Sequence, residues 1–309
     1  MFVLYHPGYV VDLGPQHRFP MQKYGLVYER LLTEGTLAGV QILQPEPVSV
    51  DDLCLVHTRD YVERFLAGAM RAPEMRLLGF PWSASLARRA RLATQGTMTA
   101  SLMAWQHGLA ANLAGGSHHA FADHGEGFSV FNDIAVAIRV LQRDGGLQRA
   151  AVIDCDVHQG NGTATIFAGD PSVFTCSLHG AKNYPFRKAQ SSLDIELPDN
   201  TDDAAYLETL QMHLPAILRR FQPQMVWYLA GVDPYVGDKL GRLALTLEGL
   251  RQRDAYVLST CYQAGIPVVT AMGGGYAPQI EDIVEAHCNT VRLACRMAAS
   301  PAVPGQAQS

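Results

Sequence analysis

Short apolar runs alternate with longer amphipathic segments over the second half of this chain. The apolar runs, each bounded by turn-forming residues, are 150–155, 172–177, 225–230 and 266–272. The amphipathic segments, which are typical of helices, are 132–143, 203–220, 246–264 and 278–298. Strands that alternate with helices form βαβ units and therefore a parallel sheet. Because several strands are apolar throughout, we predict an α/β fold whose central parallel sheet has helices on both faces.

The first half of the chain adds two strands and three helices to this prediction. The strands are 2–5 and 40–43, and the helices are 22–34, 58–66 and 83–113, with a stop signal at Gly115-Gly116. No internal repeat and no linker divides the sequence. We therefore predict a single domain, residues 1–298, followed by a disordered tail at 299–309.

Composition excludes several classes of protein. A net charge of −5 and the absence of a dense Lys/Arg run argue against a nucleic-acid-binding protein. The six cysteines contain no CxxC pair, which favours a reduced, cytoplasmic protein over a disulfide scaffold. The N-terminus does not resemble a signal peptide, and no apolar run approaches the length of a membrane span. None of these features predicts an oligomeric state.

The stretch from Ala150 to Thr163 carries the densest chemistry. Its apolar strand ends in Asp154, Asp156 and His158, at every second position. Residues two apart on extended backbone point the same way, and ligands of open α/β sheets bind beyond the carboxyl ends of strands. The pattern suits a divalent metal, although an aspartate at a strand end is also commonly a helix cap or an ion-pair partner.

Three further polar clusters follow apolar segments. Asp233 ends the strand 225–230, either as a turn cap before Pro234 or as a third metal ligand that leaves the fourth position open for water. His118 and His119 follow two glycines, in a loop that we place after a helix, and histidine is the commonest general acid and base. Tyr276 follows three glycines, either as a structural tyrosine or as a donor to a developing oxyanion.

Together these clusters resemble the zinc-dependent histone deacetylase family, which has the arginase–deacetylase fold. The matching motifs, in the order of the family, are GSHHA (116–120), DCDVHQGNGT (154–163), AGVD (230–233) and GGGY (273–276). The segment HRFPMQKY (17–24) and the short chain are most similar to class IV and bacterial members, the histone-deacetylase-like amidohydrolases.

The resemblance implies a role for each polar residue. Asp156, His158 and Asp233 would hold one Zn²⁺, with Fe²⁺ as an alternative. His119 would be the general base and then the acid, His118 its electrostatic partner, Asp154 the residue that orients His118, and Tyr276 the donor to the carbonyl oxygen. Phe128 and Tyr184 would form the walls around the acyl-lysine stem, the Gly127 carbonyl would accept from the amide, and Leu240 would lie at the rim.

The resemblance also implies a structural K⁺ site. Its ligands would be the backbone oxygens of Asp154, Asp156, His158 and Leu178, and the side chain of Ser177. One position departs from many members of the family, which have an aspartate where this chain has Asn161. A neutral amide still orients His119 but stabilises an imidazolium less than a carboxylate, so a lower His119 pKa is expected.

The expected function is removal of acetyl or other acyl groups from the lysine side-chain amide of a protein, a peptide or a small acylated amine. A two-metal ureohydrolase on the same fold is disfavoured, because Gln159, Gly160 and Tyr235 stand where further ligands are needed. An acetylpolyamine amidohydrolase and a long-chain lysine deacylase remain open. A non-catalytic acyl-lysine binding module is disfavoured, since all three ligands and Tyr276 are present.

Overall fold

One parallel sheet organises the chain in the computed structural model, which describes residues 1–299. Its eight strands lie in the order β2-β1-β3-β8-β7-β4-β5-β6, and every neighbouring pair is parallel. The strands are Phe2–Leu4 (β1), Gln41–Leu43 (β2), Leu109–Asn112 (β3), Ala150–Asp154 (β4), Val173–Gly180 (β5), Leu193–Leu197 (β6), Met225–Ala230 (β7) and Val268–Met272 (β8). This confirms the predicted fold class.

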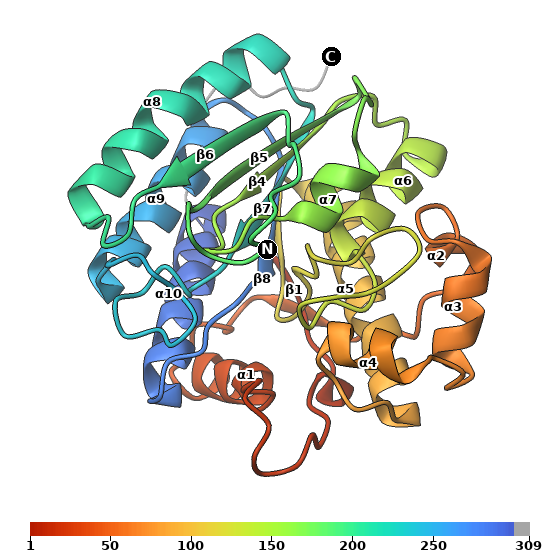
Figure 1. Cartoon of the computed structure of the whole chain (residues 1–309). Coiled ribbons are helices and arrows are strands. Elements are labelled where there is room, and N and C mark those ends of the chain that lie inside the picture. The colour runs from red at the N-terminus through yellow and green to blue at the C-terminus, as the bar shows by residue number, and fades with distance from the viewer. Residues whose placement is uncertain (300–309) are drawn as a thin grey trace.

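Helices cover both faces of the sheet (Figure 1). Those on one side are Lys23–Thr33 (α1), Asp203–Phe221 (α8), Leu247–Gln263 (α9) and Ile280–Ala299 (α10). Those on the other side are Ala84–His107 (α5), Asp133–Asp144 (α6) and Asn161–Ile166 (α7). Shorter elements are the 3₁₀ helix Pro7–Tyr9 (η1), Val50–Leu53 (α2), Arg59–Leu66 (α3) and Ala72–Leu78 (α4).

The central strand β7 shows how the two layers are joined to the sheet. Trp227 and Tyr228 are both fully buried and, being adjacent on a strand, point to opposite faces. The Trp227 ring nitrogen donates to Ser101 of α5 at 2.9 Å, whereas the Tyr228 hydroxyl donates to Asp254 of α9 at 2.5 Å. A strand covered on both faces has no solvent side, which explains its continuous apolar sequence.

The predicted helix over 83–113 is wrong in its last turn. The helix ends at His107, and Gly108 adopts a left-handed φ of 91°. The next four residues, Leu109–Asn112, form strand β3 between β1 and β8. The sequence LAAN favours a helix locally, but pairing with two neighbouring strands overrides that preference. The loop with His118 and His119 therefore follows a strand and not a helix.

Strand β6 and the short helices α2, α4 and α7 were not predicted. The last helix, α10, extends to Ala299, one residue into the predicted tail, and residues 300–309 lie outside the described residues. Among residues 1–299, no helix has the length and apolar character needed to cross a membrane.

Candidate active site

Four neighbouring strands deliver the predicted site residues to one edge of the sheet. The strands are β3, β8, β7 and β4, which are adjacent in that order. Their carboxyl ends lead into the loops that carry His118 and His119, Tyr276, Asp233, and Asp156 with His158. The four motifs are dispersed over the sequence but meet because parallel strands all end at the same edge.

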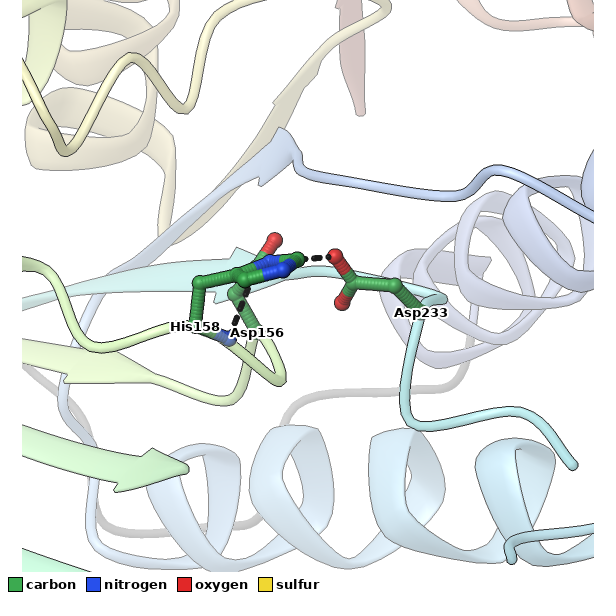
Figure 2. Close-up of side chains that lie close together, drawn as sticks. All are labelled: Asp156, His158 and Asp233. Carbon is green, nitrogen blue, oxygen red and sulfur yellow. Dashed lines mark hydrogen bonds and ion pairs between the residues drawn. The ribbon is translucent and has the colours of Figure 1, made fainter. Parts of the chain in front are cut away.

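The three predicted metal ligands converge (Figure 2). The His158 Nδ1 atom lies 3.0 Å from Asp156 Oδ1 and 3.0 Å from Asp233 Oδ2. All three residues are buried, and their ligand atoms lie within 4.8 Å of one another. The cluster therefore offers one nitrogen and two oxygens to a single point.

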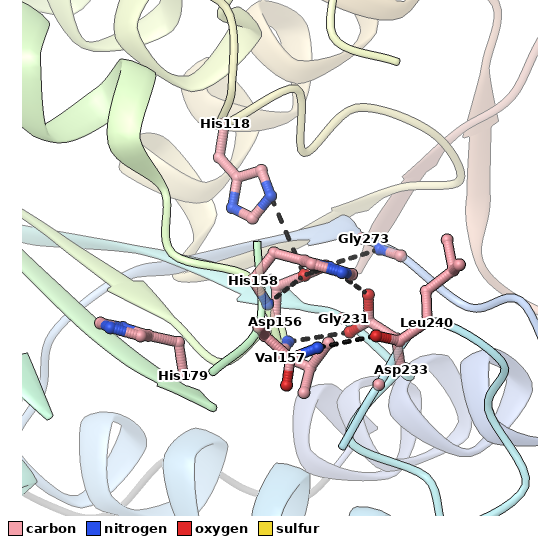
Figure 3. Close-up of polar contacts among 12 residues, drawn as sticks. His118, Asp156, Val157, His158, His179, Gly231, Asp233, Leu240 and Gly273 are labelled. Carbon is pink, nitrogen blue, oxygen red and sulfur yellow. Dashed lines mark hydrogen bonds and ion pairs between the residues drawn. The ribbon is translucent and has the colours of Figure 1, made fainter. Parts of the chain in front are cut away.

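Backbone groups hold both carboxylates in place (Figure 3). The Gly274 N–H donates to Asp156 Oδ2 at 2.7 Å, and the Val157 N–H donates to Asp233 Oδ1 at 2.9 Å. A Cβ atom at Gly274 would lie 1.9 Å from Asp233 Oδ2, so this position requires glycine. The glycines before Tyr276 thus permit a close approach of the backbone to the ligands.

The donor set fits a divalent cation. Burial and the charge of Asp156 raise the pKa of Asp233 to about 7. Burial disfavours a charged His158, but hydrogen bonds to Asp156 and Asp233 outweigh it and raise the His158 pKa to about 10. A zinc ion would satisfy the same three ligand atoms, because neutral histidine and carboxylates are its usual ligands.

His118 is held as a cation beside this cluster. Its Nδ1 atom donates to Asp154 Oδ2 at 2.7 Å, and its other ring nitrogen lies 3.9 Å from Asp156 Oδ1. Burial opposes its charge, but the charges of Asp154 and Asp156 prevail and raise the His118 pKa to about 9. The predicted pairing of Asp154 with His118 is therefore present in the geometry.

His119 has the opposite character. Its Nδ1 atom lies 2.6 Å from Asn161 Oδ1, and Asn161 Nδ2 donates to Glu126 Oε1 at 2.6 Å. Because the Glu126 carboxylate takes the amide N–H₂, the amide oxygen faces His119, whose Nδ1 must then carry the proton. Burial, followed by the charges of His118 and His158, holds the pKa of His119 well below its usual value. His119 is thus a neutral imidazole with a free lone pair on Nε2.

The pKa of His119 is low chiefly because the ring is buried, and the Asn161 hydrogen bond raises it. That an amide raises this pKa less than an aspartate would stays a prediction. Glu126, which fixes the orientation of Asn161, was missed by the sequence analysis. The only signal was the loop Gly125-Glu126-Gly127, where an acidic residue between glycines does not reveal its partner.

The loop that carries the two histidines is fixed from α6. The Asp133 carboxylate accepts from the backbone N–H of Ser117 at 2.8 Å and of Gly116 at 3.1 Å. Asn132 caps the same helix by accepting from the Ala135 N–H. The first turn of α6 thus sets the position of His118 and His119.

Two buried cations hold the strand-end loops, and neither was predicted. Lys23 Nζ donates to the Gly273 carbonyl at 2.7 Å, and the ammonium group lies over the rings of Phe19, Tyr24 and Tyr276. Arg253 Nη1 donates to the Gly231 carbonyl at 2.7 Å. Both side chains are fully buried, so each of these carbonyls accepts a hydrogen bond from a charged donor that is shielded from solvent.

Tyr276 completes the polar group around the metal ligands. Its backbone N–H donates to Asp238, and its ring centroid lies 6.4 Å from that of His158. Burial, with the charges of Asp233 and Asp156, raises the pKa of Tyr276 far above its usual value. The phenol therefore keeps its proton and is available as a hydrogen-bond donor.

Two pockets that share lining residues lie beside these groups, and together we name them the tunnel. The outer pocket, its mouth, has a volume of about 550 Å³, and Gly127, Phe128, Tyr184 and Leu240 are among its lining residues. Their role as substrate walls and rim stays a prediction. His119, His158 and Tyr276 line the mouth and also a smaller inner cavity of about 40 Å³. The mouth and the inner cavity therefore meet beside the candidate metal ligands.

The residues predicted to bind K⁺ lie on β4, on β5 and in the loop after β4. Asp154 is opposite Ser177 in the strand register, and Leu178 follows on β5. The Ser177 hydroxyl lies 2.9 Å from His179 Nδ1. This placement keeps the expected ligands close together, and ion binding there stays a prediction.

Comparison with known proteins agrees with this geometry. Residues 17–291 match the family model described as the histone deacetylase domain. The chain belongs to the histone deacetylase family. It is 32% identical to histone deacetylase 2 of Arabidopsis thaliana, over 89% of this chain and 74% of that protein. It is 33% identical to the acetoin utilization protein AcuC of Bacillus subtilis, over 88% of this chain and 76% of that protein.

Two other similarities extend this result. An uncharacterized protein of Picosynechococcus is 46% identical, over 92% of this chain and 95% of its own length. The crystal structure of the HDA15 HD domain superposes with a TM-score of 0.80 at 24% identity, over 97% of this chain and 89% of that one. The latter supports the histone deacetylase fold alone. Family membership indicates a deacetylase, that is, a hydrolase, in general terms.

Proposed function

We propose that this protein is a zinc-dependent lysine deacetylase. The observation that carries the proposal is the convergence of Asp156, His158 and Asp233 at the end of a tunnel, beside a neutral His119 and a protonated Tyr276. Three protein ligands leave one coordination position open, as in catalytic zinc sites. The tunnel walls suit the apolar stem of an acyl-lysine.

Each polar residue of the site has a separate role in the proposed reaction. A bound zinc ion would polarise the amide carbonyl and acidify a water molecule. His119 accepts the proton of that water on Nε2 and then delivers it to the lysine amine that leaves. Tyr276 donates its O–H to the carbonyl oxygen as this becomes tetrahedral. The Gly127 carbonyl accepts the amide N–H, and His118 remains a cation held by Asp154.

The inner cavity favours a short acyl group. Its volume of about 40 Å³ is comparable to the space of one or two water molecules. Phe19, Tyr24 and the buried Arg89 are among the residues that close it. An acetyl group fits such a space, whereas a fatty-acyl chain requires these walls to move.

The cysteines support a reducing compartment such as the cytoplasm. All six are free, and four of them are buried. Burial raises the pKa of Cys155 to about 12, which keeps its thiol protonated and unreactive.

A K⁺ ion between β4 and β5 is part of the same proposal, and dialysis against Na⁺ or K⁺ followed by thermal unfolding tests it.

The test is turnover on a matched series of peptides that carry acetyl-, butyryl-, octanoyl- or myristoyl-lysine, with and without a chelator. We expect chelator-sensitive cleavage, fastest for the acetyl peptide, with activity restored by added zinc. Preference for the long chains would overturn the assignment of a short acyl group. Binding of zinc and peptide without any cleavage would instead identify an acyl-lysine binding module.

A further inference from the structure

The mouth of the tunnel carries charge of one sign. Five cationic side chains line it, and no carboxylate is among its lining residues. These five, which we name the cationic rim, are Arg18, Arg76, Lys182, Lys239 and Arg242. They are exposed, in a chain whose net charge is −5. The local charge of the mouth is thus opposite to the charge of the whole protein.

The cationic rim surrounds the entrance. Arg18 belongs to the loop before α1, Arg76 to α4, Lys182 to the loop after β5, and Lys239 and Arg242 to the loop after β7. The Arg18 guanidinium lies 5.0 Å from the centroid of the Phe128 ring, directly at the tunnel wall. Segments that are distant in sequence therefore place their positive charges around one opening.

Few neighbouring acids neutralise the cationic rim. Asp199 pairs with both Arg242, at 2.6 Å, and Lys182, at 3.5 Å, so two cations share one carboxylate. Within residues 1–299, Arg76 and Lys239 have no carboxylate within 4.0 Å. Two further acids lie near the mouth and are already engaged. Asp238 is partly buried and accepts the backbone N–H groups of Leu240 and Gly241, and Glu126 is buried beside Tyr184 and accepts from Asn161 Nδ2. An excess of positive charge is left at the mouth.

We propose that the substrate is an acyl-lysine peptide with acidic residues next to the modified lysine. This inference rests on the proposed function, because the acyl-lysine in the tunnel is what brings the flanking residues to the cationic rim. Charges in a cleft act over the Debye length, about 8 to 10 Å at physiological salt, and steer ligands of opposite sign. Basic peptide tails and cationic polyamines are repelled by the same charges.

The test compares three acetyl-lysine peptides of equal length, flanked by glutamate, serine or arginine, with N-acetylputrescine alongside. We expect kcat/KM to be at least about tenfold higher for the glutamate peptide than for the arginine peptide at about 20 mM salt. The difference shrinks at about 300 mM salt, because the charges are screened. Equal rates, or preference for the arginine peptide or the polyamine, would overturn the inference.

Two double variants separate local charge from net charge. Arg76→Glu with Lys239→Glu should remove or reverse the preference for glutamate. Arg219→Glu with Arg220→Glu makes the same change in net charge at the end of α8, which leads into the start of β7 at the opposite edge of the sheet. This second pair should keep the preference, and an equal loss in both pairs would contradict a role of the cationic rim.

Binding distinguishes failure of the inference from failure of the proposed function. Affinity for the three peptides is measured by fluorescence anisotropy with the zinc-loaded Tyr276→Phe variant, which needs no turnover. Tighter binding of the glutamate peptide without cleavage by the wild type supports the cationic rim and rejects the deacetylase. Tighter binding of a single-stranded RNA oligonucleotide than of the glutamate peptide would reject the peptide as the occupant.

Discussion

The inner end of the tunnel, which we name the floor, is formed by Asp156, His158 and Asp233 with the neighbouring His118, His119 and Tyr276. The floor and the mouth lie on the same loops but differ in burial and in the sign of their charge. Asp233, at the floor, is completely buried and accepts from a backbone N–H, whereas Lys239, at the mouth and in the same loop, is exposed. Carboxylates dominate the floor, and cations dominate the mouth. Phe186 at the mouth has 88% of its surface exposed.

This difference separates chemistry from selectivity. At the floor, the carboxylates of Asp156 and Asp233 and the Nδ1 atoms of His118, His119 and His158 have partners at fixed distances, so a substitution there leaves a buried group unsatisfied and is costly. At the mouth, the cationic side chains are exposed, so substitutions there are expected to alter charge with little effect on packing. The four predictions below test this separation, from the largest effect to the smallest.

The largest effect is expected from the metal ligands. Asp156→Ala or His158→Ala removes one of three ligand atoms and leaves the other carboxylate, Asp233, buried without a cation. We expect loss of zinc, measured by atomic emission, and of all detectable turnover. Asp199→Ala, which removes the carboxylate paired with Arg242 and Lys182 of the cationic rim, is the matched control and should retain both. Stoichiometric zinc in an Asp156→Ala/His158→Ala double variant would refute the ligand assignment.

Tyr276→Phe removes one hydroxyl from the floor. We expect zinc content to be unchanged and kcat to fall by about 10²-fold, the size typical of one lost oxyanion donor. Tyr235→Phe is a suitable control, because its hydroxyl faces Asp282 at 3.2 Å. A kcat equal to that of the wild type would remove Tyr276 from the mechanism.

Asn161→Asp places a second carboxylate against Glu126, at a contact of 2.6 Å between Asn161 and Glu126. Two carboxylates at this distance resist ionising together, so at low pH they share one proton. As the pH rises and that proton is lost, the two negative charges repel one another. His119 then loses its fixed partner, and we expect kcat to fall by about 10-fold, more at high pH than at low pH.

Glu126→Gln in the same background is the control for that prediction. The double variant exchanges amide and carboxylate, restores one hydrogen bond between the two side chains, and should recover most of kcat across the pH range. If Asn161→Asp alone behaved like the wild type at all pH values, the Glu126 carboxylate would not constrain His119 through Asn161.

The smallest effect is expected at the mouth. Phe186→Ala removes an exposed ring and should change the free energy of unfolding by no more than about 0.5 kcal/mol, measured by urea denaturation. Phe131→Ala, in the core, is the contrasting variant and should lower it by about 3 to 5 kcal/mol. A large loss of stability in Phe186→Ala would show that the mouth is packed as tightly as the floor.

The fold was largely predictable from the sequence because its central strands are apolar and its helices amphipathic. Strand β3 was missed, since the sequence LAAN continues the alanine-rich pattern of α5 and only Gly108 marks the break. Strand β6 was missed because it is an edge strand with mixed polarity, LDIEL, most of which is only partly buried. Both segments are strands because they pair with neighbouring strands, and the local sequence pattern does not predict that pairing.

Some residues of the candidate site could also be predicted from the sequence, and others could not. Asp156, His158 and Asp233 were predictable because each follows a buried strand, and such positions converge in a parallel sheet. Glu126 and Lys23 were not, since each acts on a residue that is remote in sequence. The cationic rim also escaped notice, because its five members come from separate segments and form no run of like charge.

Lys23 ties the start of the chain to its end. Its ammonium group holds the carbonyl of Gly273, a residue 250 positions away. A fragment that starts after Lys23 would retain all three metal ligands, His119 and Tyr276, yet that carbonyl would face a space without a donor. During synthesis on the ribosome, Lys23 emerges 250 residues before Gly273, so α1 lacks the loop that it supports until that much more chain has been made.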